Sequence, residues 1–201
     1  KSTHRIPMGA PQFYTNDLDE NGNYIKEITE KYSEANAIVL DKHAEPNVIG
    51  GLSNTLRYKW FDLNFMFSYQ FGGYSYDNWA QKTEHGGNDL EANIPTYYRD
   101  SWKQPGDITD IPRHGVAPQF DDRFLENASF LRLKNVTLTY SLPQQLLSKS
   151  KFFSSARVYL QGQNLLTFTK FTGLDPEFSA NIYRAQYPMS RQFTLGVELN
   201  F

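Results

Sequence analysis

The chain has 201 residues, a formal net charge of −2 at pH 7 and a mean hydropathy of −0.60. The near-neutral charge argues against a dedicated nucleic-acid-binding protein, and the absence of cysteine excludes disulfides and thiolate metal sites. No run of about 18 apolar residues predicts a transmembrane helix. A transmembrane β-barrel stays compatible with the composition, because only every second residue of its strands is apolar and the aromatic content is 15%.

The first third of the chain gives a weak strand signal. Short apolar pieces at residues 13–15, 24–28 and 38–40 are separated by polar turns. We expect one or two strands in this region.

One segment of this region resembles the start of a calcium-binding EF-hand loop, because oxygen-bearing residues alternate ahead of a glycine. The bidentate acid of such a loop would fall at Ile28, and Glu27 is one position short. We therefore expect a plain turn, with a metal site as the weaker alternative. The candidate ligands are Asp17, Asp19 and Asn21.

Residues 48–58 and 61–72 predict a β-hairpin. Every odd position of the second strand is large and apolar, and the even positions are mostly polar. This two-residue period is a strong strand signal. In a membrane barrel we expect Phe65 and Phe67 to face lipid and Ser68 to face the interior.

Residues 74–128 lose the alternation and collect Gly, Pro, Asp and Asn, with short helical turns expected near 77–82 and 95–102. Such a long connection is unusual in a compact soluble domain and expected of an extracellular barrel loop. Four loop aromatics are candidate contacts to a sugar or peptide, with packing of the loop against itself as the alternative. They are Trp79, Tyr97, Tyr98 and Trp102.

No enzyme signature is present in the sequence. The four histidines lack metal-ligand spacing, and there is no nucleophile elbow, P-loop or dinucleotide fingerprint. Carboxylates of the long loop could supply a glycosidase pair, but solvated loop charges explain them more simply. We therefore predict a protein that is not an enzyme and needs no cofactor.

Three further strands are predicted at 130–142, 156–170 and 190–201. The connections between the five predicted strands alternate between short and long. This is the rhythm of a barrel with periplasmic turns and extracellular loops, and a sandwich does not predict it as simply.

The last predicted strand alternates perfectly and stops on an aromatic carboxyl terminus. Its spacing of polar, glycine, apolar and aromatic positions resembles the signal by which bacterial outer-membrane barrels are recognised for assembly. An ordinary terminal strand of a soluble sheet is the alternative. The residues of this candidate assembly signal are Thr194, Gly196, Leu199 and Phe201.

On the last three predicted strands the outward-facing positions can be followed to the extracellular end of each strand. Four of these positions are occupied by cations. A Lys or Arg facing lipid is tolerated only near the membrane interface. We therefore expect a collar that contacts lipid phosphates, unless a bulge near Lys134 turns the third-strand cations inward. The collar residues are Arg132, Lys134, Lys170 and Arg191.

Four linked segments, at 50–73, 129–147, 155–177 and 187–201, resemble the C-terminal end of SusC/RagA-type TonB-dependent transporters of the Bacteroidetes outer membrane. The resemblance implies an all-β fold in which residues 1–201 supply about five or six C-terminal strands of an antiparallel transmembrane barrel of about 22 strands with long extracellular loops. Trp60 departs from the glycine that the family commonly has in its turn.

The resemblance also implies a function and partners. It predicts import of glycans or peptides across the bacterial outer membrane with a surface-exposed SusD-like lipoprotein. The TonB complex would act through an N-terminal region outside this chain. On this interpretation the chain is a C-terminal fragment that does not transport by itself. The alternatives are a soluble β-rich carbohydrate-binding or adhesin module and, third, a glycoside hydrolase.

Overall fold

The computed structural model describes residues 9–15, 17–23, 25, 27–148, 152–178 and 181–201. The chain divides into two units. One comprises residues 1–42 and 76–125, and the other comprises 43–75 and 126–201.

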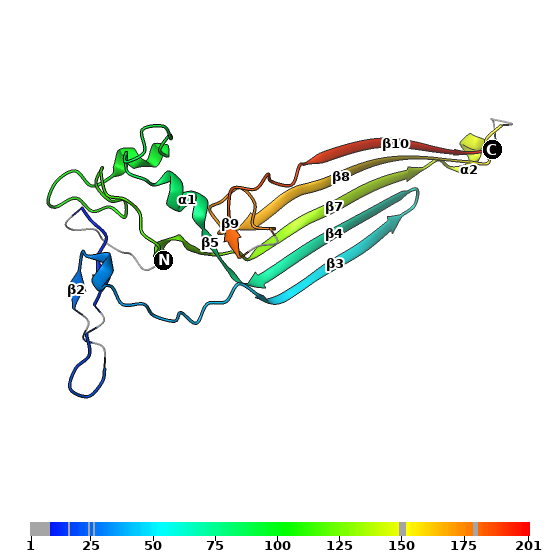
Figure 1. Cartoon of the computed structure of the whole chain (residues 1–201). Helices are drawn as coiled ribbons and strands as arrows, with labels where there is room; N and C mark the ends of the chain where they lie inside the picture. Colours follow the sequence, from blue (N-terminus) through cyan, green and yellow to red (C-terminus); the bar gives the residue numbers. More distant parts are fainter. Residues whose placement is uncertain (1–8, 16, 24, 26, 149–151, 179–180) are drawn as a thin grey trace. The chain divides into compact units, whose positions relative to one another are not determined.

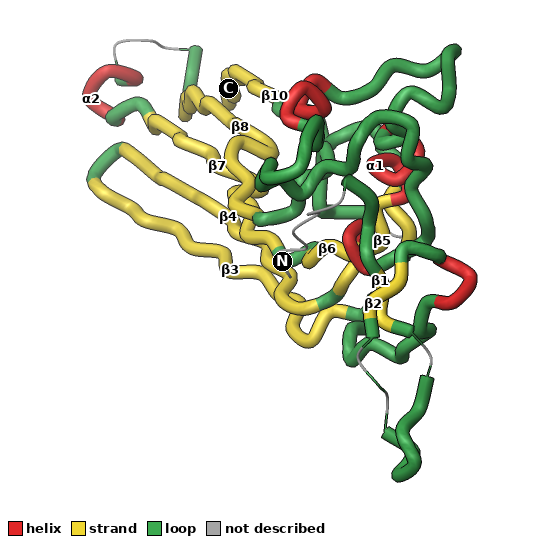
Figure 2. The backbone as a smooth tube through the Cα atoms, turned by 90° about the vertical axis from the view of Figure 1, so that its left-hand side faces the viewer, coloured by secondary structure: helices red, strands yellow, loops and turns green. Residues whose placement is uncertain are grey.

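The second unit is built on a five-stranded antiparallel sheet in the order β10–β8–β7–β4–β3 (Figures 1 and 2). Its strands are β3 (Pro46–Tyr58), β4 (Phe61–Gly72), β7 (Phe130–Ser141), β8 (Ser155–Thr169) and β10 (Gln192–Asn200). Each strand lies within about two residues of a range that the alternation predicts. The short strands β5 (Tyr74–Asp77), β6 (Leu125–Asn127) and β9 (Ile182–Tyr183) and the short helix α2 (Gln144–Leu147) lie in the connections.

The strand register gives the sheet one apolar and one polar face. Phe67 is paired with Leu52 on one side and Leu133 on the other, whereas Asn64 is paired with Thr55 and Thr137. Many large side chains of the apolar face are exposed in this chain, which would be unfavourable in water and is expected of a surface that contacts lipid. They include Leu52, Leu56, Phe71, Leu138, Leu160, Leu166, Phe168, Phe193, Leu195 and Val197.

Aromatic side chains gather at the end of the sheet that carries the short turns. The rings of Phe61 and Tyr140 lie 4.9 Å apart, and those of Phe153 and Phe201 lie 5.3 Å apart. Trp60, in the two-residue β3–β4 turn, is exposed. Aromatic rings favour the membrane interface, so this end is suited to headgroup level.

A β-bulge interrupts β7 at Lys134. The adjacent residues Met66 and Phe67 of β4 are paired with Asn135 and Leu133, so Lys134 is an extra residue in β7. The inserted residue changes the parity of the strand, because the faces alternate every residue. Arg132 therefore lies opposite Ser68, on the polar face.

The terminal strand β10 lies at an edge of the sheet and is paired along its length with β8. Gly196 lies opposite Tyr159, whose ring occupies the space that a Cβ at position 196 would need. Any larger residue would displace this ring. Glycine in the candidate assembly signal therefore has a packing reason as well.

We expect Phe201→Ala to lower the amount of the full-length protein in the outer membrane. The substitution removes the contact between the rings of Phe153 and Phe201 and the aromatic end of the candidate assembly signal. The measurement is quantitative immunoblotting of outer-membrane fractions, with Phe152→Ala as a control that removes an exposed aromatic nearby. Unchanged levels of the Phe201 variant would contradict the assembly role.

The first unit contains short elements and a small aromatic core. Its elements are β1 (Phe13–Tyr14), β2 (Ile28–Thr29), the 3₁₀ helices η1 (Tyr32–Glu34), η2 (Thr96–Asp100) and η3 (Asp122–Phe124), and α1 (Asn78–Thr83). The ring of Tyr76 lies 4.4 Å from that of Phe120 and 6.1 Å from that of Phe124. Residues 38–40 are not a strand, contrary to the prediction, and the predicted piece 24–28 falls partly outside the described residues.

Candidate functional site

The most constrained polar arrangement of the second unit joins β7 to the loop that follows β8. The Arg132 side chain is 2% exposed. Its Nη2 donates a hydrogen bond of 2.5 Å to Oδ1 of Asp175, and its Nη1 lies 3.2 Å from Oε2 of Glu177. Glu177 also accepts a hydrogen bond of 2.8 Å from Nζ of Lys134. Two cations of one strand thus hold two carboxylates of one loop.

Asp175 also organises the loop backbone. Its Oδ1 accepts a hydrogen bond from the amide of Glu177, and its Oδ2 accepts one from the amide of Met189. Burial alone would raise the pKa of Asp175, but the Arg132 hydrogen bond and the two amides outweigh it and hold the pKa below its ordinary value of 3.8. The contact is therefore fully formed at neutral pH and is lost only as the pH falls through the lowered pKa.

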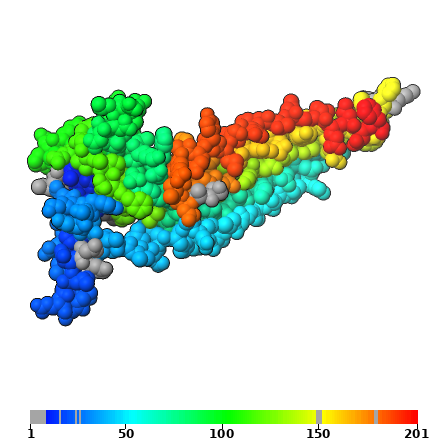
Figure 3. Space-filling view, viewed as in Figure 1, coloured from blue at the N-terminus to red at the C-terminus, as the bar shows by residue number. Residues whose placement is uncertain are grey.

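The loop has a small core of its own. The rings of Phe171, Phe178 and Tyr183 lie 5.0–5.5 Å from one another. The amide N–H of Leu174 donates a hydrogen bond of 2.7 Å to the hydroxyl oxygen of Tyr183. In the space-filling view this segment, in orange, lies where β10 begins (Figure 3). The loop is therefore a folded element and presents fixed side chains.

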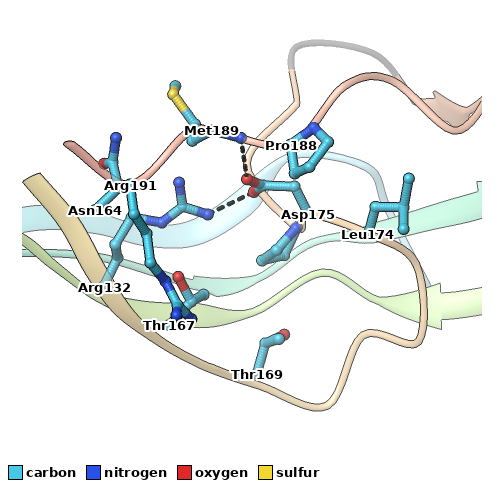
Figure 4. Close-up of a pocket in the computed structure, with 10 residues that line it drawn as sticks. Arg132, Asn164, Thr167, Thr169, Leu174, Asp175, Pro188, Met189 and Arg191 are labelled. Carbon is cyan, nitrogen blue, oxygen red and sulfur yellow. Dashed lines mark hydrogen bonds and ion pairs between the residues drawn. The ribbon is translucent and has the colours of Figure 1, made fainter.

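A cavity of about 270 Å³ lies between this loop and the ends of β8 and β10. Figure 4 shows Arg132 extending toward Asp175, with Met189 above the carboxylate. The polar residues that line the cavity are Arg132, Asn164, Thr167, Thr169, Asp175 and Arg191.

The predicted lipid-contacting collar is wrong. Arg132 is buried against Asp175, and Lys134 shares Glu177 with it, so neither cation faces lipid. The physical reason is the bulge at Lys134, which reverses the facing of β7 beyond Asn135. Lys170 is exposed, and Arg191 lines the cavity with Arg132. The four cations therefore do not form one lipid-facing ring.

Sequence reasoning missed Asp175 and Glu177. They lie 43 residues from their cationic partners in the chain, so no local pattern connects the pairs. The available signal was chemical, because two cations near the end of a strand need either a headgroup or carboxylates. The acids of the "DPE" sequence at 175–177 were the nearest unassigned acids after the adjacent strand.

The candidate substrate-contact aromatics lie in the first unit and differ in exposure. Trp79 is 52% exposed and Tyr97 is 43% exposed, whereas Tyr98 is 2% exposed. The hydroxyl of Tyr98 donates to the Glu84 carbonyl, and burial raises the pKa of Tyr98 to about 12. Trp102 is half-buried, with its ring against Gly9. Tyr98 and Trp102 therefore pack the loop, and Trp79 and Tyr97 are accessible.

Glu84 is a partly buried acid in this loop. Its Oε1 accepts a hydrogen bond of 2.6 Å from the Tyr97 hydroxyl. Burial raises the pKa of Glu84 above its ordinary value of 4.5, and the Tyr97 hydrogen bond and nearby Arg123 offset only part of this shift. Glu84 binds its proton more tightly in the folded loop than in the unfolded chain. The stability of the loop therefore decreases as the pH rises from the ordinary pKa of a glutamate through the raised pKa of Glu84.

We expect Glu84→Gln to stabilise this loop at neutral pH, because glutamine keeps an acceptor for Tyr97 and removes the buried charge. The measurement is hydrogen exchange of residues 76–100 in the full-length protein as a function of pH. Protection should fall in the wild type as the pH rises from 4.5, the ordinary pKa of a glutamate, through the raised pKa of Glu84, and it should stay level in the variant. Parallel pH profiles would contradict this assignment, and Glu91→Gln, at an exposed position, is the control.

The EF-hand-like segment forms a turn. Oδ1 of Asp19 accepts hydrogen bonds from the amides of Asn21 and Asn23, at 2.9 and 2.8 Å. These amides hold the pKa of Asp19 below its ordinary value. No group of metal-ligating side chains occurs among the described residues, and the Asp19 carboxylate is committed to the turn. Asp17 and Asn21 are both exposed.

The fold and its two faces define a class of protein. An antiparallel sheet with one exposed apolar face, one polar face, aromatics at the short-turn end and a folded loop at the other end is a section of a transmembrane β-barrel wall. No helix within the described ranges is long and apolar enough to cross a membrane.

Comparison with known proteins gives the family. The chain is 30% identical over 209 residues to the TonB-dependent receptor SusC of Bacteroides thetaiotaomicron, a match that covers 98% of this chain and 20% of that protein. It is 31% identical over 169 residues to TonB-dependent receptor P3 of Formosa agariphila, which covers 78% of this chain and 16% of that receptor. No protein-family model matches the chain.

Solved structures give the same result. The chain is similar to a structure of the RagAB peptide transporter with a TM-score of 0.84 and 38% identity, over 97% of this chain and 21% of that one. The chain is a segment of a SusC/RagA-type TonB-dependent receptor, an outer-membrane protein. It spans about a fifth of the length of the receptors it matches. The similar proteins are receptors and importers rather than enzymes.

Proposed function

We propose that the full-length protein imports oligomeric nutrients, either glycans or peptides, in a TonB-dependent manner. The observation that carries the proposal is that nearly the whole chain is similar both to a TonB-dependent receptor and to a peptide transporter. One is named a TonB-dependent receptor SusC and the other a peptide transporter, so the comparisons support import without selecting the substrate.

A surface lipoprotein is the proposed partner. The similar structure is a RagAB complex, and such a partner would meet the extracellular loops of the barrel. We propose that Trp79 and Tyr97 contact the substrate, because these loop aromatics are accessible and aromatic rings stack on sugars and side chains. The exposed apolar face argues against a soluble binding module.

The test is uptake of fluorescent oligosaccharides and oligopeptides by cells that express the full-length protein. Uptake of one substrate class should require the protein, the TonB complex and the partner surface lipoprotein, and it should decrease in a Trp79→Ala variant. Uptake that persists without TonB would contradict active import. An inward-facing charge-neutral change such as Thr137→Ser serves as the control for expression.

A further inference from the structure

Two of the residues that line the cavity at the β8–β10 loop have a buried polar atom without a hydrogen-bond partner among the described residues. Arg132 makes its ion pairs through its two terminal nitrogens, and its buried Nε–H has no partner in the described part of the chain. Asn164 donates from Nδ2 to the carbonyl of Ser190, and its buried Oδ1 has no partner there either. A buried donor and a buried acceptor left unpaired are costly, and a ligand that satisfies both would be favoured.

The charge of the cavity is also unbalanced. Asp175 and Glu177 are matched by Arg132 and Lys134. Arg191 lines the same cavity and makes no ion pair with the described residues. Its guanidinium is therefore a surplus cation, and its planar group of donors fits a carboxylate.

Backbone geometry holds Asn164 in place. Asn164 has a φ of 53°, in the left-handed region, where two unpaired residues of β8, Asn164 and Leu165, lie opposite the single residue Lys134 of β7. Asparagine tolerates this region better than most residues do. The side-chain amide of Asn164 therefore belongs to strand β8 of the barrel wall. Arg191 is the residue immediately before β10.

We propose that this cavity binds a carboxylate that has an N–H or O–H donor next to it. Arg191 and Nε of Arg132 receive the carboxylate, and Oδ1 of Asn164 accepts the neighbouring donor. Both the last residue of a peptide and a uronic acid sugar have this chemistry. The proposal deepens the proposed import function, on which it rests for its biological role, by adding an acidic-group subsite to the polar face of the barrel wall.

The test measures binding to the purified full-length receptor by calorimetry. The probes are acetyl-trialanine and its carboxyl-terminal amide, and digalacturonic acid and its dimethyl ester. One acid should bind about tenfold or more tightly than its neutral analogue, and Arg191→Gln should abolish this preference. Lys170→Gln, which removes an exposed cation just beyond β8, should retain it. The acid that shows the preference identifies the source of the carboxylate.

Three results would overturn the proposal. They are equal binding of acid and neutral probes to the wild type, a preference that survives Arg191→Gln, and an equal loss in Lys170→Gln, which would indicate general attraction to the rim. A crystal structure with the preferred probe that shows only ordered water in the cavity would also overturn it. Binding to the purified receptor does not require energy supplied through TonB. If cells fail to import the substrate while the purified receptor still prefers the acid probe, only the import function is refuted.

Discussion

Replacement of Asp175 by alanine is expected to release the β8–β10 loop from the sheet. Arg132 is 2% exposed, and the substitution removes its shortest hydrogen bond together with the acceptor of two loop amides. Removing one partner of a buried ion pair costs about 3–5 kcal/mol, because the remaining charge stays buried without compensation. Glu177 stays near Arg132 and makes the lower end of this range the better expectation.

The measurement is hydrogen exchange of residues 171–178 in the full-length protein. Protection should fall by a factor of at least about 100 in Asp175→Ala, which corresponds to the lower end of the expected cost. The double variant Arg132→Met, Asp175→Leu is the control for the buried charge: it removes the uncompensated Arg132 cation but not the loss of the acceptor for two loop amides, so it should recover only part of the lost protection. A single variant with wild-type protection would show that the ion pair does not hold the loop.

The sheet could be predicted because its signal is local. In β4 one face carries a large apolar residue at every position, and the partner strands show the same period. This period selects both the strand and its facing, since a slip of one residue would exchange the two faces. The aromatic end of the sheet follows from the same pattern, because Tyr58, Phe61 and Tyr140 terminate the apolar rows.

The ion-pair site could not be predicted in the same way. A one-residue bulge has no distinctive sequence, so the alternation predicts outward-facing cations and leaves a bulge near Lys134 as an alternative that the sequence alone does not select. This single residue moved Arg132 from the expected lipid face to the polar face. Its carboxylate partners lie far along the chain in a segment without periodicity, where only the fold brings the charges together.

The lower predictability of the first unit has a different cause. Its elements are short, and hydrogen bonds between side chains and backbone take the place of regular pairing. Asp77 caps α1 through the amide of Ala80, and Asp121 accepts hydrogen bonds from both the amide and the side chain of Arg123. Such contacts select a conformation residue by residue and leave no period in the sequence.

Replacement of Phe65 by arginine is expected to destabilise the full-length barrel far more than the same change at Phe71. Both residues lie on the apolar face of β4, six positions apart, so they differ in depth by roughly 15–20 Å along a tilted strand. An arginine that faces lipid costs about 2–4 kcal/mol at the membrane midplane and about 0–1 kcal/mol near the interface. Phe65 lies in the middle of the strand, and Phe71 lies next to its end.

The depth dependence separates lipid contact from ordinary packing. Urea titration of the receptor refolded into lipid vesicles gives the unfolding free energy of each variant, and Phe65→Leu and Phe71→Leu provide the cost of losing the aromatic ring alone. The ring of Phe65 lies 6.0 Å from that of Phe67, and the ring of Phe71 lies 5.4 Å from that of Tyr69, so the two sites lose comparable aromatic contacts. After that correction the arginine penalty should remain large at Phe65 and nearly vanish at Phe71. Equal penalties at both depths would mean that this face is covered by protein, because a protein-covered face has no gradient from midplane to interface.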